Sequence, residues 1–133
     1  MARKMVAALI VKDKKLLLVK NIKHNQVRIE PPGGKVLPGE GVESALIGEV
    51  KEELGVDIKP LRLFGVFPTV SPEGRFDVWT FLAEIVGGEP KVPESEQGKI
   101  EGYGWFGVDE ARGNRFLVPN LRAVLEELEK FSN

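Results

Sequence analysis

Three closely spaced carboxylates on one predicted helix have the clearest capacity for chemistry in this sequence. They are Glu49, Glu52 and Glu53, and at about 100° per residue their side chains fall within an arc of about 100°. Glu49 and Glu53 are four residues apart, where like charges repel. A divalent cation such as Mg²⁺, which takes a few carboxylate oxygens together with waters and substrate phosphates, would relieve that repulsion. The competing interpretation is a solvated, Glu-rich face of a surface helix.

The helix that must position these carboxylates is predicted to run from Val42 to Leu54. Gly41 takes the N-cap position, and Gly55 follows the last turn, where a left-handed cap favours glycine. Apolar residues at intervals of four form a stripe next to the acidic edge: Val42, Leu46, Val50 and Leu54. One side of the helix is therefore expected to pack against a core while the neighbouring edge stays negative.

A Gly-rich turn precedes this helix, and the two together form a motif over residues 33–56, GGKVLPGEGVESALIGEVKEELGV. The motif positions are Gly34, Glu40, Glu49, Val50, Glu52, Glu53, Gly55 and Val56. This pattern resembles the Nudix box of the Nudix hydrolases, and Glu30 precedes the turn much as a Glu does in family members. The chain is therefore identified as a member of that family by resemblance.

One position departs from the family pattern, because Gly48 stands where the box has an arginine. In the family that arginine is thought to hold and orient neighbouring box carboxylates. Glycine cannot do so, and inside a helix it costs about 1 kcal/mol relative to alanine. Either another basic residue takes over, or catalysis is weakened. We expect a working but slower enzyme; the alternative is a nucleotide- or metal-binding protein on the same fold.

The resemblance implies hydrolysis of a diphosphate linked to another moiety, usually a nucleoside, with Mg²⁺ as cofactor and Mn²⁺ as a substitute. The metal ligands that it implies are Glu49, Glu52, Glu53 and the backbone carbonyl of Gly34. Glu40 is expected to steady the loop or to bind metal through water. The general base would be a box carboxylate or a later one, Glu94 or Glu96; we include Glu96 among the catalytic residues. A solvated acidic loop is the competing interpretation for that later pair.

The substrate is less well defined by the sequence. ADP-ribose pyrophosphatases of the family often carry a proline at a set distance after the box, and Pro72 lies near that distance. Nucleoside triphosphates, oxidised ones included, and dinucleoside polyphosphates remain alternatives. The residues expected to bind substrate are Arg28, Lys35 and Arg75 at phosphates and Phe67 at a base. Strand aromatics are more often core residues, which is the competing interpretation for Phe67.

Composition limits the remaining classes. A chain of 133 residues is expected to form a single domain over 1–133. The net charge of −1 gives no basic excess for nucleic-acid binding. No apolar run approaches the length of a membrane span, and the absence of cysteine excludes disulfides and thiolate sites. We expect a cytoplasmic protein, and because many relatives are dimers, the resemblance allows a homodimer.

The pattern of apolar and turn residues predicts an α/β chain. The expected strands are 5–11, 16–19, 28–30, 57–67, 76–86 and 103–108; the expected loops are 21–27, 68–75 and 89–101. The first two strands form a hairpin about the polar residues 12–15. A helical turn is expected at 109–112 and an amphipathic helix at 119–131. The resemblance implies the Nudix fold, a mixed β-sheet sandwiched between α-helices.

Overall fold

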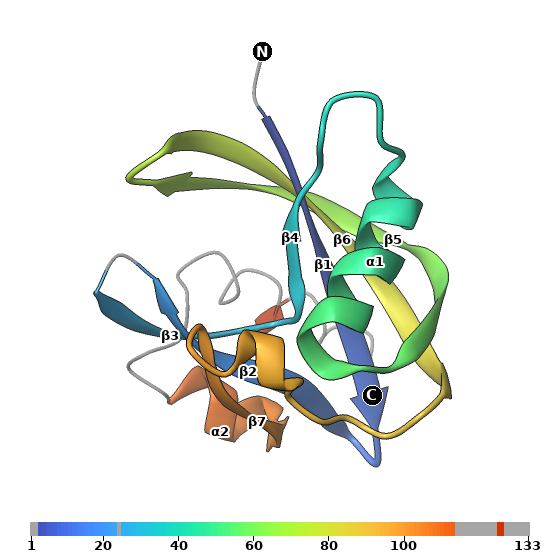
Figure 1. The fold of residues 1–133 in the computed structure, drawn as a ribbon. Helices are drawn as coiled ribbons and strands as arrows, with labels where there is room; N and C mark the ends of the chain where they lie inside the picture. Colours follow the sequence, from blue (N-terminus) through green and yellow to red (C-terminus); the bar gives the residue numbers. More distant parts are fainter. Residues whose placement is uncertain (1–2, 24, 114–124, 127–133) are drawn as a thin grey trace.

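The computed structural model describes residues 3–23, 25–113 and 125–126 (Figure 1). Its elements in chain order are β1 (Arg3–Lys12), β2 (Lys15–Lys23), β3 (Gln26–Glu30), β4 (Gly33–Lys35), α1 (Val42–Leu54), β5 (Asp57–Ser71), β6 (Gly74–Gly87), the 3₁₀ turn η1 (Glu94–Glu96), β7 (Ile100–Gly107) and α2 (Val108–Arg112).

The strands form a mixed sheet in the order β3-β2-β1-β6-β5, with β4 also paired to β1 and β7 to β2. The β1–β6 pair is parallel, and the other described pairs are antiparallel. β1 pairs with β6 from Arg3 to Ile10 but with β2 only at Val11 and Lys12, so β1 links the two parts of the sheet. Figure 1 shows α1 lying in front of β1 and beside β4. The predicted α/β class is confirmed.

Strand alternation divides the core into two clusters, one on each face of the sheet. Along β2, Leu17 and Val19 belong to the cluster that includes the buried side of α1, whereas Leu16 and Leu18 belong to the other cluster. Successive side chains of a strand point to opposite faces, which accounts for this division. The box helix therefore packs on one face, and its acidic edge is left at the margin of that face.

The hairpin predicted at the start of the chain is confirmed. Val11 pairs with Leu16 and Lys12 with Lys15, which leaves Asp13 and Lys14 as a two-residue turn. Both turn residues have positive φ, 53° and 63°, as a type I′ turn requires.

Two predicted loops are wrong, because strands extend through them. In 21–27, β2 continues to Lys23 and β3 begins at Gln26. In 68–75, β5 continues to Ser71 and β6 begins at Gly74. These polar residues pair their backbones across strands, and β5 tolerates its prolines because it lies at the edge of the sheet order. The short β4, within the Gly-rich turn, was not predicted.

The helical turn predicted near 109–112 is confirmed as α2, and its N-cap residue, Gly107, donates its backbone N–H to the Glu110 carboxylate. The helix predicted at 119–131 lies outside the described residues except for Leu125 and Glu126, which are helical, with Leu125 buried in the second core cluster. Within the described part of the chain, no helix has the length and apolar character needed to cross a bilayer.

Candidate active site

The helix that carries the three carboxylates has the predicted boundaries, Val42 to Leu54. Gly41 is its extended N-cap, and Gly55 closes it with φ 68° while its N–H donates to the Lys51 carbonyl at 2.9 Å. Leu46, Val50 and Leu54 are fully buried. This packed stripe fixes the rotation of α1 and therefore the direction in which its acidic edge faces.

Glu53 lies inside the structure and is tied to the Gly-rich turn. Its side chain is 7% exposed, and one of its carboxylate oxygens accepts the backbone N–H of Gly33 at 3.1 Å. A buried carboxylate costs free energy unless polar groups compensate it. The hydrogen bond to Gly33 supplies part of that compensation and joins the last turn of α1 to β4.

Glu49 lies one turn before Glu53 on α1, and its side chain lies against Gly34, the residue of β4 that follows Gly33. A Cβ built on Gly34 would lie 2.6 Å from the carboxyl carbon of Glu49, so only glycine fits this approach without displacing the carboxylate. The motif glycine thus leaves a space into which Glu49 projects, beside the Gly34 backbone. Two of the three predicted ligands are therefore next to β4, at successive residues.

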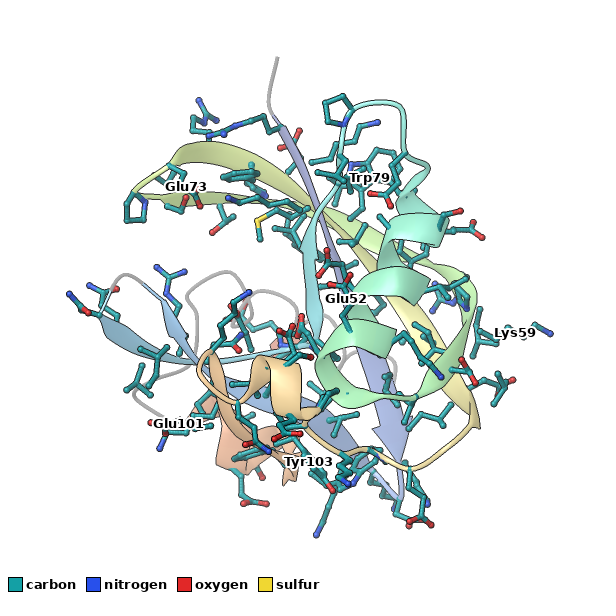
Figure 2. The ribbon with its side chains drawn as sticks, viewed as in Figure 1. Glu52, Lys59, Glu73, Trp79, Glu101 and Tyr103 are labelled. Carbon is teal, nitrogen blue, oxygen red and sulfur yellow. The ribbon has the colours of Figure 1, made fainter. Side chains whose placement is uncertain are left out.

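Glu52 and Gly48 are on the open part of the helix. Glu52 is exposed and is seen beside β4 in Figure 2. Gly48 is also exposed, and a Cβ added there would meet nothing within 4 Å. A longer side chain at position 48 would have room, so packing does not account for the glycine.

These donors fit a hard divalent cation, although they do not form a closed cage. Among the described residues, no group of three or more acidic or histidine side chains is arranged to hold a metal ion. Mg²⁺ is usually bound by one or two carboxylates together with waters and substrate phosphates, so a cage of three is not required. Glu49 and Glu53 beside Gly33 and Gly34 supply oxygen donors of that kind.

Glu40 stabilises the loop between β4 and α1. Its carboxylate accepts the Leu37 N–H at 3.2 Å, and its own N–H donates to the Leu37 carbonyl at 3.0 Å. These bonds close the turn around Gly39, which has φ 83°. The contact agrees with the first of the two roles expected for Glu40.

Lys35, the residue after Gly34, points toward the end of the β5–β6 hairpin. Its ammonium forms an ion pair with the carboxylate of Glu73 and lies 6.0 Å from the centre of the Phe76 ring. Arg3 covers the same ring at 4.4 Å and donates to the backbone carbonyl of Glu73. Glu73 was not among the predicted site residues, because its partners are remote along the chain and leave no local pattern.

Arg28 lies in β3, directly across from Asn21 of β2. Asn21 is buried and donates its side-chain amide to the carboxylate of Glu30, which is the last residue of β3. Sequence reasoning missed Asn21 because residues 21–27 were predicted to be a loop. The apolar alternation Leu17, Val19 could have been extended to place it on the inner face of a strand.

The remaining predicted substrate contacts do not gather around Lys35. Arg75 precedes Phe76 on β6, so it points to the opposite face of the hairpin from the ring that Lys35 approaches. Phe67 is half-buried against the second core cluster, with its ring 6.3 Å from that of Phe64. That packing favours the core interpretation of Phe67.

The later acidic candidates lie together in the turn η1. Glu94 is exposed, whereas the side chain of Glu96 is only 17% exposed and has the Lys99 ammonium 4.0 Å away. Glu96 is therefore the more enclosed of the two. The backbone of this segment is joined to β2 by the bond from the Ile22 N–H to the Lys99 carbonyl.

Comparison with known protein families identifies the family of this chain. The model of the NUDIX domain matches residues 1–128. The chain belongs to the Nudix hydrolase family. Among solved structures, a NUDIX hydrolase from Nitrosomonas europaea has a TM-score of 0.84 at 26% identity, over 100% of this chain and 92% of that one. A MutT NUDIX hydrolase from Burkholderia pseudomallei has a TM-score of 0.81 at 30% identity, over 96% and 98%.

Curated Nudix relatives match over part of their length. An ADP-ribose pyrophosphatase of Methanocaldococcus jannaschii is 40% identical over 65% of this chain and 53% of its own. The uncharacterised Nudix hydrolase YvcI of Bacillus subtilis is 36% identical over 74% and 63%. This Nudix chain therefore spans less than two thirds of either relative.

Proposed function

We propose that this protein is a metal-dependent Nudix hydrolase that cleaves a diphosphate linkage in a nucleoside diphosphate derivative, with residues 1–133 acting as one domain. The observation that carries the proposal is the contact between the box helix and β4. There Glu53 accepts the Gly33 N–H and Glu49 occupies the space beside Gly34. Family membership adds support, because its members are hydrolases by name.

In this proposal Glu49, Glu52 and Glu53 hold Mg²⁺, or Mn²⁺ in its place, with help from the Gly34 carbonyl. When bound, the cation neutralises phosphate oxygens and lowers the pKa of bound water. The chain itself positions the carboxylates through the packed stripe of α1 and the Gly33 hydrogen bond. Glu96, partly enclosed in η1, is the candidate outside the box for taking a proton from water.

The favoured substrate is ADP-ribose or a close analogue. It is supported by the relative named as an ADP-ribose pyrophosphatase and by Pro72, which begins the turn of the β5–β6 hairpin. Nucleoside triphosphates form the second group, since another relative, from Escherichia coli, is named an 8-oxo-dGTP diphosphatase at 33% identity.

A second candidate function is nucleotide or metal binding with weak catalysis. The exposed Gly48 favours it, because no side chain at that position can orient the neighbouring carboxylates. The two functions differ in turnover and share the metal site, so turnover is the measurement that separates them.

The test measures mononucleotide release from ADP-ribose, a dinucleoside polyphosphate, and ordinary and oxidised nucleoside triphosphates, each with Mg²⁺ or Mn²⁺. Glu53→Gln is the loss-of-site variant. Glu43→Gln is the matched control, because Glu43 is an exposed carboxylate in the first turn of the same helix. We expect turnover of one substrate that survives Glu43→Gln and is lost in Glu53→Gln. Turnover that persists in Glu53→Gln would contradict the site, and metal binding without turnover would favour the second function.

A further inference from the structure

We propose that Glu73, at the end of the β5–β6 hairpin, competes with the substrate diphosphate for the ammonium of Lys35 and thereby sets substrate affinity. Glu73 acts through Lys35 and is thus a positioning residue. This inference rests on the proposed function, since it concerns the affinity of the same site for phosphates.

The first step is the placement of Lys35. It directly follows Gly34, whose backbone lies against the Glu49 carboxylate, so its backbone is one residue along β4 from the proposed metal site. Successive side chains of a strand point to opposite faces, so the Lys35 side chain leaves β4 on the face away from Glu49. Lysine carries its charge on a flexible stem with three rotatable donors, which lets the ammonium change partners. In this structure its partner is the Glu73 carboxylate.

The second step is the weakness of that ion pair. Both side chains are well exposed, at 48% for Lys35 and 40% for Glu73, and ion pairs at such sites contribute little in water. A diphosphate carries more negative charge than one carboxylate and is an acceptor of the same kind. The diphosphate can therefore take the ammonium of Lys35 from the Glu73 carboxylate, and the affinity for the diphosphate is lowered by the free energy of the ion pair that must be broken.

The third step is that contacts made by groups other than the Glu73 carboxylate anchor the hairpin. Arg3 donates to the Glu73 backbone carbonyl and covers the Phe76 ring at 4.4 Å. The Glu73 N–H donates to the Ser71 hydroxyl at 3.1 Å. Substitution of the carboxylate should thus change the charge beside Lys35 while leaving these anchors of the hairpin intact.

The test measures binding of α,β-methylene ADP, which has a non-cleavable diphosphate, in Mg²⁺ by calorimetry. We expect Glu73→Gln to lower the Kd about twofold to fivefold, the range typical of an exposed ion pair. Lys35→Met should raise the Kd, and in that background Glu73→Gln should have little further effect, as a double-mutant cycle requires for a pair that acts together. With a substrate that the enzyme hydrolyses, Glu73→Gln should lower KM by a similar factor and should change kcat less.

The matched control is Glu101→Gln, which removes a second exposed ion pair, with Lys20 at 3.0 Å and 45% exposure on both sides. Glu101 is on β7, far from Glu73 in Figure 2, and its loss should leave the Kd unchanged. An unchanged or higher Kd in Glu73→Gln would overturn this inference alone. The same gain in the Lys35→Met background would also overturn it, because Glu73 would then act without Lys35. A wild-type protein that does not bind the analogue would overturn the proposed function together with it.

Discussion

At the scale of single residues, the contact between Gly34 and Glu49 makes the glycine of the motif a requirement for the observed position of the Glu49 carboxylate. A Cβ at position 34 would meet the end of the Glu49 side chain at 2.6 Å, and a flexible carboxylate can move away from it. The fold should tolerate the change, while the carboxylate should lose its position beside β4.

Gly34→Ala is therefore expected to separate activity from stability. We expect kcat to fall about a hundredfold, the effect that a misplacement near 1 Å can have, while the melting temperature shifts by only a few degrees. Steady-state kinetics and thermal unfolding measure the two quantities. Near wild-type turnover in Gly34→Ala would show that the position of Glu49 is not needed.

Gly48 gives the opposite case, an exposed glycine with open space around it. Gly48→Ala should stabilise the protein by about 0.5–1 kcal/mol through helix propensity alone. Gly48→Arg should add a basic group next to the box carboxylates and raise kcat by up to about tenfold, the worth of one charged hydrogen bond. The alanine variant controls for helix stabilisation, and an arginine variant no faster than it would refute the idea that Gly48 limits catalysis.

At the scale of elements, the hairpin between β1 and β2 keeps two side chains in a left-handed conformation. Asp13 and Lys14 have φ of 53° and 63°, where Asn-Gly is the preferred pair. We expect the double substitution Asp13→Asn and Lys14→Gly to stabilise the protein by about 1 kcal/mol. Chemical denaturation gives the free energy of unfolding, and a loss of stability would mean that these residues make contacts beyond the turn.

Local signals explain which elements were predictable. The helix α1 was predicted with its correct ends because the apolar stripe lies within it and the glycines Gly41 and Gly55 flank it directly. The strand segments in 21–27 and 68–75 were missed because their stability comes from backbone pairing with another strand rather than from apolar residues. The three-residue β4 carries two glycines and has no strand pattern at all.

The candidate site was predictable to a similar extent. The box carboxylates follow from spacing on a single helix, although nothing in the sequence showed that Glu53 is buried while Glu52 is exposed. The ion pair of Lys35 with Glu73 joins strands that are far apart in the chain, so it depends on the sheet order and leaves no local pattern.

At the scale of the whole molecule, a metal ion bound between α1 and β4 should stabilise the folded state, because the unfolded chain does not hold these groups together. At a free Mg²⁺ concentration of 100 times the Kd, the gain would be about 2.7 kcal/mol. We expect Mg²⁺ to raise the melting temperature, EDTA to reverse the shift, and Glu53→Gln to reduce it. An equal shift in Glu53→Gln would place the bound ion elsewhere.

The parallel pairing of β1 with β6 has a consequence for synthesis on the ribosome. β1 leaves the exit tunnel before β6, but Arg3 to Ile10 find their partners in β6 only when Phe76 to Ala83 have been made. Until β6 has been made, the β1–β2 hairpin and α1 lack the strand against which their apolar residues pack. Long-range pairing of this kind slows folding and exposes apolar surface to aggregation. Nascent chains that stop before β6 should therefore depend on chaperones that bind apolar segments, whereas chains released after it should not.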